Sequence, residues 1–108
     1  MALNVATTID AQAAMIRLSG ELDARTAPLF QRAVEQAATQ PVTRLVLLMA
    51  ELEYISSAGL GVLLRAVHTM PGVELYVSGA QPQVQDTLQL SGVDRVVMMG
   101  ETYDAARP

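Results

Sequence analysis

The feature that most constrains the fold is an unbroken apolar run near the middle of the chain. Six consecutive apolar residues, Leu45 to Ala50, form it, and a helix that crosses a bilayer needs roughly 20. Apolar residues without polar alternation over Leu45–Met49 are typical of a strand buried on both faces of its sheet. Helices pack against sheets that contain such strands, so the run predicts an α/β protein.

Two strands are expected before this run. Val5, Thr7 and Ile9 alternate with small or polar residues, and a second strand extends from about Ala13 to Leu18, bounded by Gly20. Only three residues separate the two segments, which predicts an antiparallel hairpin.

A helix is predicted between the hairpin and the apolar run. Phe30, Ala33, Val34 and Ala37 are spaced i, i+3, i+4 and i+7, so they share one helix face. Three further residues are expected to mark its ends, with a cap at Thr26, a first-turn proline at Pro28 and a stop at Pro41.

The chain after the apolar run begins with a polar break. Glu51 and Glu53 are paired carboxylates with no histidine or cysteine close by in sequence, and we interpret them as a solvated loop. A second helical stripe follows, made of Leu60, Leu63, Leu64 and Val67 and closed by Pro71 and Gly72.

The remaining segments complete an alternating pattern. They predict a strand at Val73, Leu75 and Val77, and then a third helix that begins at Pro82, buries Val84 and Leu88 and stops at Gly92. A last strand is predicted at Val96 to Met99, followed by a short helix from Glu101 to Arg107 that Thr102 caps. The order β-β-α-β-α-β-α-β-α implies a mixed β-sheet with packed helices in a single domain, 1–108.

Composition excludes several classes of function. The chain has no cysteine, and all seven basic residues are arginine, so thiolate metal sites, thiol nucleophiles and a phosphate-loop lysine are excluded. A net charge of −4 and four aromatic residues disfavour a nucleic-acid partner. The N-terminus lacks the pattern of a secretory signal, so a soluble, cytoplasmic protein without direct membrane insertion is expected. A mean hydropathy of +0.29 is high for a small monomer and hints at a partner surface.

No catalytic set assembles from the motifs. The one histidine, His68, lies off the apolar stripe and is expected to be solvated. Ser57 lacks the glycine of a nucleophile elbow, because Ile55 stands there, and Gly59 and Gly61 lack the third glycine of a dinucleotide fingerprint. We therefore predict a protein that is not an enzyme and needs no metal or cofactor.

The turn from Ile55 to Gly61 is the strongest candidate site. It follows the most apolar strand and precedes a helix, whose free backbone amides and dipole suit an anion, including a phosphate on Ser57. The alternative is that Ser56 or Ser57 only caps the helix. For the earlier turn from Gly20 to Asp23, the alternatives are a loop in which Asp23 caps a helix and an acidic patch for a partner.

Three segments carry a family resemblance. Leu18-Ser19-Gly20-Glu21-Leu22-Asp23, followed by Thr26-Ala27, resembles the G-E-L-D segment of bacterial anti-sigma factor antagonists, which are STAS-domain proteins. The stretch from Tyr54 to Leu64 is similar to their D-S-S-G-L-G-V-L signature, and Leu90-Ser91-Gly92-Val93 is similar to their C-terminal S-G-L segment. The matches follow in order over nearly the whole chain.

The resemblance implies a STAS fold and a switch. In this family the unphosphorylated antagonist binds an anti-sigma factor, often a serine kinase of the histidine-kinase-like ATPase type, and so frees a sigma factor. The kinase phosphorylates a signature serine, which maps onto Ser57, with Ser56 as the alternative, and a serine phosphatase reverses the step. ATP would belong to the kinase. The implied partner-binding residues are Glu21, Asp23, Ser56, Ser57, Ala58, Gly59 and Gly61.

Three positions depart from the family pattern. Ser56 replaces the usual aspartate, Ala58 replaces the second serine, and Leu48 stands where an acidic or amide residue is common. The departures at Leu48 and Ser56 favour an alternative function, a phosphorylation-independent STAS subunit that serves as a scaffold in a signalling complex or as an accessory to a lipid-transport ATPase.

Overall fold

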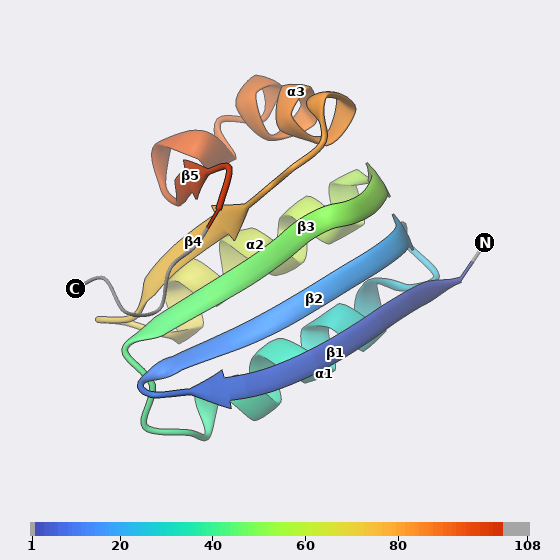
Figure 1. Ribbon diagram of the computed structural model, residues 1–108. Helices are drawn as coiled ribbons and strands as arrows, with labels where there is room; N and C mark the ends of the chain where they lie inside the picture. The colour runs from blue at the N-terminus through green and yellow to red at the C-terminus, as the bar shows by residue number, and fades with distance from the viewer. Residues whose placement is uncertain (1, 103–108) are drawn as a thin grey trace.

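The computed structural model describes residues 2–102, which form a five-stranded mixed sheet in the order β1-β2-β3-β4-β5 (Figure 1). The strands are β1 (Leu3–Asp10), β2 (Ala13–Leu22), β3 (Arg44–Ile55), β4 (Glu74–Ser78) and β5 (Met98–Gly100). The helices are α1 (Ala27–Ala38), α2 (Ser57–Thr69), α3 (Pro82–Leu90) and a 3-10 helix, η1 (Val93–Arg95). β1 and β2 form the predicted antiparallel hairpin, and the other strand pairs are parallel.

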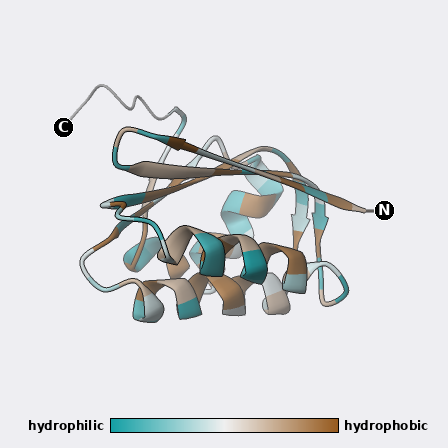
Figure 2. Ribbon diagram, turned by 90° about the horizontal axis from the view of Figure 1, so that it is seen from below, coloured by the Kyte–Doolittle hydropathy of each residue, from teal (hydrophilic) through white to brown (hydrophobic). Residues whose placement is uncertain are grey.

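Helices α1 and α2 form one layer against one face of the sheet (Figures 1 and 2). The predicted face of α1 is confirmed, because Phe30, Ala33, Val34 and Ala37 are all buried there. Side chains of β2 and β3 that point toward this layer complete the core, namely Ile16, Leu18, Leu45, Leu47 and Met49. On the opposite face Val46 is also buried and Leu48 is half-buried, as the apolar run predicts.

β3 continues through the segment predicted to be a loop, so that prediction is wrong. The pairing of β3 with β2 shifts register between Arg17 and Ser19 and again between Gly20 and Glu21, and each shift places one extra residue in β3. The extra residues change the burial period from two to three, so Met49, Leu52 and Ile55 are buried while Glu51 and Glu53 are exposed within the strand. The two bulges in β3 therefore explain why Glu51 and Glu53 give the polar pattern of a loop although they lie within a strand.

The inward face of α2 also differs from the predicted stripe. Its buried residues are Gly59, Val62, Leu63 and Ala66, whereas Leu64 is 42% exposed. Leu60 and Val67 are partly buried against the core. The helix is therefore rotated by about one residue relative to the prediction, because small residues at Gly59 and Ala66 let its backbone approach the sheet.

The last part of the chain is confirmed in part. α3 buries Val84 and Leu88 as predicted, and it ends just before Gly92. Val96, however, follows η1 and precedes the last strand, which spans only Met98–Gly100. The predicted helix from Glu101 to Arg107 falls mostly outside the described residues.

Helix α3 extends the fold beyond β4 and covers the second half of β3 (Figure 1). The side-chain amide of Gln81 donates to the carbonyl of Ala50 at 2.8 Å, and that of Gln83 donates to the carbonyl of Glu53 at 3.2 Å. These bonds support the part of β3 that leads to α2, past the end of its pairing with β4. Over residues 2–102, every helix is too short or too polar to cross a membrane.

Candidate functional site

The candidate site lies where β3 passes directly into α2. Ile55 is the last residue of β3 and Ser57 the first of α2, with Ser56 in extended conformation as the N-cap residue between them. The amide of Leu60 closes the first helical turn by donating to the carbonyl of Ser56 at 3.0 Å. The amides of residues 57–59 precede this bond and have no carbonyl within the helix, so they offer donors to an anion.

Leu22 joins the first motif to the second. Its carbonyl accepts a hydrogen bond from the amide of Ser56 at 2.8 Å. A Cβ on Gly59 would lie 2.6 Å from Leu22 Cγ and 2.8 Å from its Cδ2, so only glycine lets α2 approach this close. The G-E-L-D segment and the serine-containing signature are therefore parts of one site.

Gly20 is required by the bend that carries this segment to the site. Its φ of +106° is in the region that L-residues rarely adopt, and a Cβ there would overlap the carbonyl oxygen of Ala2. The residue lies between the two register shifts, where β2 adjusts to β3. The bend positions Glu21, Leu22 and Asp23 beside the start of α2.

Asp23 and Thr26 form a closed turn before α1. Asp23 Oδ1 accepts hydrogen bonds from the amides of Arg25 at 2.9 Å and Thr26 at 3.1 Å. Thr26 Oγ1 donates to the carbonyl of Glu21 at 2.8 Å and accepts from the amide of Asp23 at 2.9 Å. Thr26 is the N-cap residue of α1, but its hydroxyl makes no capping bond to the helix, so the predicted role is corrected to that of a turn lock.

The carboxyl of Asp23 is held ionised by this turn. The hydrogen bond from the amide of Thr26 is the largest effect and lowers the pKa of Asp23 below its ordinary value of 3.8. Burial opposes it by a lesser amount, and the hydrogen bond from the amide of Arg25 lowers the pKa further. The prediction that Asp23 caps a helix is wrong, because its carboxylate accepts from the amides of Arg25 and Thr26, which precede the first residue of α1. Its charge also persists near the site at any pH above its pKa.

The two adjacent serines differ sharply in environment. Ser56 Oγ is buried and finds no hydrogen-bond partner among residues 2–102, and it makes no capping bond to α2. Ser57 is exposed at the first position of the helix. Ser56 therefore occupies the N-cap position of α2, but its hydroxyl does not make the capping bond that the alternative predicts.

The sequence reasoning missed two exposed apolar side chains near the site. Tyr54 is 51% exposed and pairs in register with Glu21 across β2 and β3, and Leu64 is 42% exposed on α2. In the sequence, Tyr54 stands out only as part of the family signature, and Leu64 fits the predicted buried stripe. The three-residue burial period at the end of β3 is what exposes Tyr54.

Comparison with known proteins identifies the family. The family model described as the STAS domain matches residues 4–106. The chain belongs to the STAS domain family.

Two kinds of relative resemble this STAS domain. A protein named anti-sigma F factor antagonist from Paenibacillus polymyxa is 30% identical over 86 residues, which are 77% of this chain and 74% of that protein. The crystal structure of an anti-sigma factor antagonist from Mycobacterium paratuberculosis has a TM-score of 0.88 at 21% identity and covers 95% of this chain and 89% of its own. The structure of the Bacillus cell fate determinant SpoIIAA in the phosphorylated form has a TM-score of 0.68 at 22% identity and covers 92% of this chain and 91% of its own. At these identities the two structures establish the shared fold.

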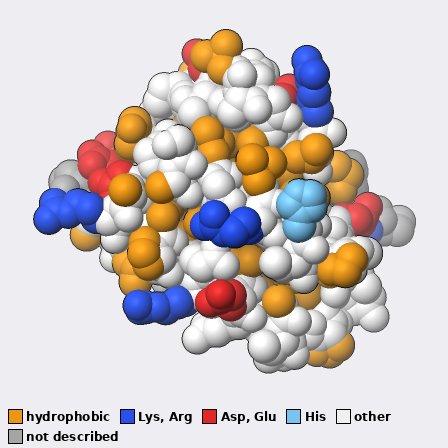
Figure 3. All heavy atoms as spheres, turned by 180° about the vertical axis from the view of Figure 1, so that it is seen from behind, with side chains coloured by type: hydrophobic (Ala, Val, Ile, Leu, Met, Phe, Trp, Pro, Cys, Tyr) orange, Lys and Arg blue, Asp and Glu red, His pale blue; other side chains and the backbone are white. Residues whose placement is uncertain are grey.

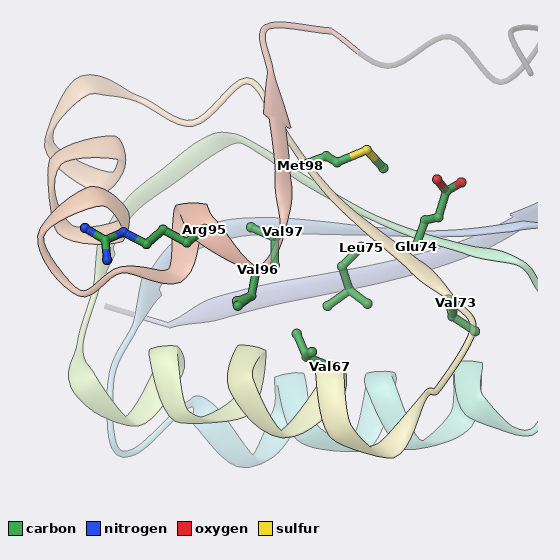
Figure 4. A pocket seen from close by; sticks show the side chains of 8 residues that line it. All are labelled: Val67, Val73, Glu74, Leu75, Arg95, Val96, Val97 and Met98. Atoms are coloured by element: carbon green, nitrogen blue, oxygen red, sulfur yellow. The ribbon is translucent and has the colours of Figure 1, made fainter.

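A cavity and the single histidine of the STAS domain lie apart from the candidate site. A cavity of about 330 Å³ between α2, β4 and η1 is lined mainly by apolar side chains, with Arg95 and Glu74 at its rim (Figure 4). His68 lies exposed on the face covered by the helices, as predicted (Figure 3). Among residues 2–102, no three His, Cys, Asp or Glu side chains are grouped to hold a metal ion.

Proposed function

We propose that this STAS domain is an anti-sigma factor antagonist controlled by phosphorylation of Ser57. The unphosphorylated domain binds an anti-sigma factor that is also a serine kinase of the histidine-kinase-like ATPase type. Binding frees a sigma factor, phosphorylation ends the binding, and a serine phosphatase restores it. ATP belongs to the kinase, and the domain itself takes part as substrate and ligand.

The observation that carries the proposal is the contrast between the two serines. A kinase must bring the acceptor hydroxyl in line with the γ-phosphate of ATP, which requires an accessible oxygen. Ser57 is exposed at the start of α2, whereas Ser56 Oγ is buried. Accessibility therefore favours Ser57 over the alternative acceptor Ser56.

The geometry at Ser57 explains how a phosphate could be added without unfolding the domain. The group brings a charge of about −1.5 to −2 and three acceptor oxygens. The amides of residues 57–59 and the positive end of the α2 dipole stabilise such an anion. The phosphate therefore changes the surface while the core beneath stays packed.

The same phosphate changes what a partner meets. Glu21 and Asp23 lie on the segment that Leu22 joins to the start of α2, so the face is already acidic. A partner that pairs with these carboxylates would then also have to desolvate a dianion at its interface. We infer that the partner surface comprises Glu21, Asp23, Ser56, Ser57, Ala58, Gly59 and Gly61.

The test uses the full chain as bait in a lysate of the organism that encodes it. Captured proteins are identified, incubated with ATP, and the bait is mapped for phosphopeptides. We expect a histidine-kinase-like ATPase to be captured, phosphate on Ser57, and release of the kinase. Ser57→Ala should keep the capture and lose the phosphate, while Ser57→Asp should capture less of the kinase.

Phosphate on Ser56 would keep the switch but move the acceptor by one residue and overturn the accessibility argument. Two other outcomes would contradict the switch itself. Capture of the ATPase with neither serine modified, or equal capture by Ser57→Asp and wild type, would favour the phosphorylation-independent subunit.

A further inference from the structure

The two edges of the sheet differ in how they are protected. β5 is the edge beside β4 and has only three residues, which leaves little backbone for another strand to pair with. β1 forms the opposite edge (Figure 1) and has eight residues paired one to one with β2, with no register shift. The β1 edge is therefore long and regular.

β1 also lacks the side chains that usually keep an edge from pairing. It contains no proline, lysine or arginine, and its one charged residue, Asp10, stands at its end. Alternate residues of an antiparallel edge strand direct their amide and carbonyl groups away from the sheet. Such an edge is a template for a further strand.

A groove of mixed polarity runs beside this edge. A cavity of about 480 Å³ lies between β1 and α1, and it is lined by the apolar Leu3, Val5, Leu29 and Ala33 and by the polar Asn4, Thr7, Arg32 and Gln36. Leu29 is 43% exposed, so the groove presents apolar surface to solvent. Ile9, at the other end of the strand, is 49% exposed.

We propose that β1 is a homodimerisation edge, where a second copy adds its own β1 antiparallel about a two-fold axis. A two-fold axis perpendicular to the sheet leaves the side chains of both copies on their original faces, and residues directly opposite each other in paired strands must have side chains on the same face. The axis must therefore pass through a residue pair, and the centre of the strand offers Ala6 or Thr7. The sheet would then continue through ten strands.

Both registers place the exposed isoleucine in the groove. With Ala6 on the axis, Ile9 of one copy lies opposite Leu3 of the other, and with Thr7 on the axis it lies opposite Val5. The two-fold axis repeats this contact, so each copy supplies both the side chain and the groove. This self-complementarity is the reason to assign the edge to a second copy.

Charge does not oppose the pairing. Residues 3–9 are uncharged, so no like charges face each other along the paired strands. With Thr7 on the axis, Asp10 lies opposite the uncharged Asn4, on the face of the sheet away from α1.

The dimer edge is separate from the proposed switch. Ser57 follows β3, which lies two strands inward from β1. A second copy on β1 would leave the start of α2 exposed, so the dimer stands or falls independently of the function proposed above.

Sedimentation equilibrium of the full chain tests the proposal directly. At concentrations up to about 0.5 mM we expect the mass to rise from 11.5 kDa toward twice that value. Ile9→Lys should weaken the dimer at least about tenfold, because an edge lysine opposes pairing. Leu90→Lys is the matched control, since Leu90 is 90% exposed on α3 and the change in charge is the same.

Single cysteines test the register, because the chain has no other cysteine. Directly opposite residues in antiparallel strands have Cα atoms about 4.5 to 5.5 Å apart, within the range of a disulfide. Ala6→Cys or Thr7→Cys should therefore form a disulfide dimer under mild oxidation, while Gln89→Cys should not. A chain that stays at 11.5 kDa throughout, or a dimer that Ile9→Lys and Leu90→Lys leave equally intact, would overturn the proposal.

Discussion

Replacing Gly59 by alanine tests whether the two motifs are held together by close packing. Alanine favours a helix over glycine by about 0.5 to 1 kcal/mol, which would stabilise α2. The new Cβ, however, lies 2.6 Å from Leu22 Cγ and 3.0 Å from Ile55 Cγ1. Leu22 is fully buried and cannot move aside freely, so overpacking costs about 1 to 3 kcal/mol. The net change in unfolding free energy is a loss of up to about 2.5 kcal/mol.

Gly61→Ala is the matched control within the same helix. A Cβ at Gly61 meets only the guanidinium of Arg65, at 3.4 Å, so the helix gain is retained. We expect Gly61→Ala to raise the unfolding free energy by about 0.5 to 1 kcal/mol. The two variants should therefore differ by about 1 to 3 kcal/mol in urea unfolding, or roughly 4 to 12 °C in Tm.

A double-mutant cycle connects the effect to Leu22. Leu22→Ala alone should cost about 2 to 5 kcal/mol, but in the Gly59→Ala background it also removes the clash. The two changes should therefore couple favourably by more than about 0.5 kcal/mol. Equal stabilisation by Gly59→Ala and Gly61→Ala, or no coupling to Leu22, would refute the packing argument.

Three further predictions concern the residues around this contact. The lowered pKa of Asp23 contributes stability at neutral pH that is lost as pH falls below its ordinary 3.8 and through its folded value, so urea unfolding of wild type and Asp23→Asn should converge only at acidic pH. Thr26→Val removes the hydroxyl that bonds the carbonyl of Glu21 and should cost about 1 to 3 kcal/mol in the same assay, whereas a loss below about 0.5 would contradict the turn-lock role. Ser56→Ala should change stability by less than about 0.5 kcal/mol, because the hydroxyl it removes has no partner among residues 2–102; a loss of a full capping bond, about 1 kcal/mol, would argue otherwise.

The hairpin, the helices and their order were predictable because they depend on local periodicity. Alternation in β1, the i, i+3, i+4, i+7 spacing in α1 and the proline at the start of α3 are each read within a few residues. The family motifs likewise placed the candidate site at the junction of β3 and α2. These features can therefore be predicted without knowing which distant residues lie beside them.

Pairing between strands decided the features that local reading missed. The extra residues of β3 exist only relative to β2, so the three-residue burial period that exposes Glu51, Glu53 and Tyr54 is invisible in either strand alone. The true inward face of α2 depends in the same way on how closely Gly59 approaches Leu22.

The sequence by itself determined the order of the five strands and of α1, α2 and α3, and that two serines stand before a helix. Only the tertiary structure decided that Ser57 is exposed while Ser56 Oγ is buried, and that Leu22 ties the two motifs into one site. The physical reason is that residue type and spacing set local conformation, whereas exposure and close contact depend on what a distant segment places alongside.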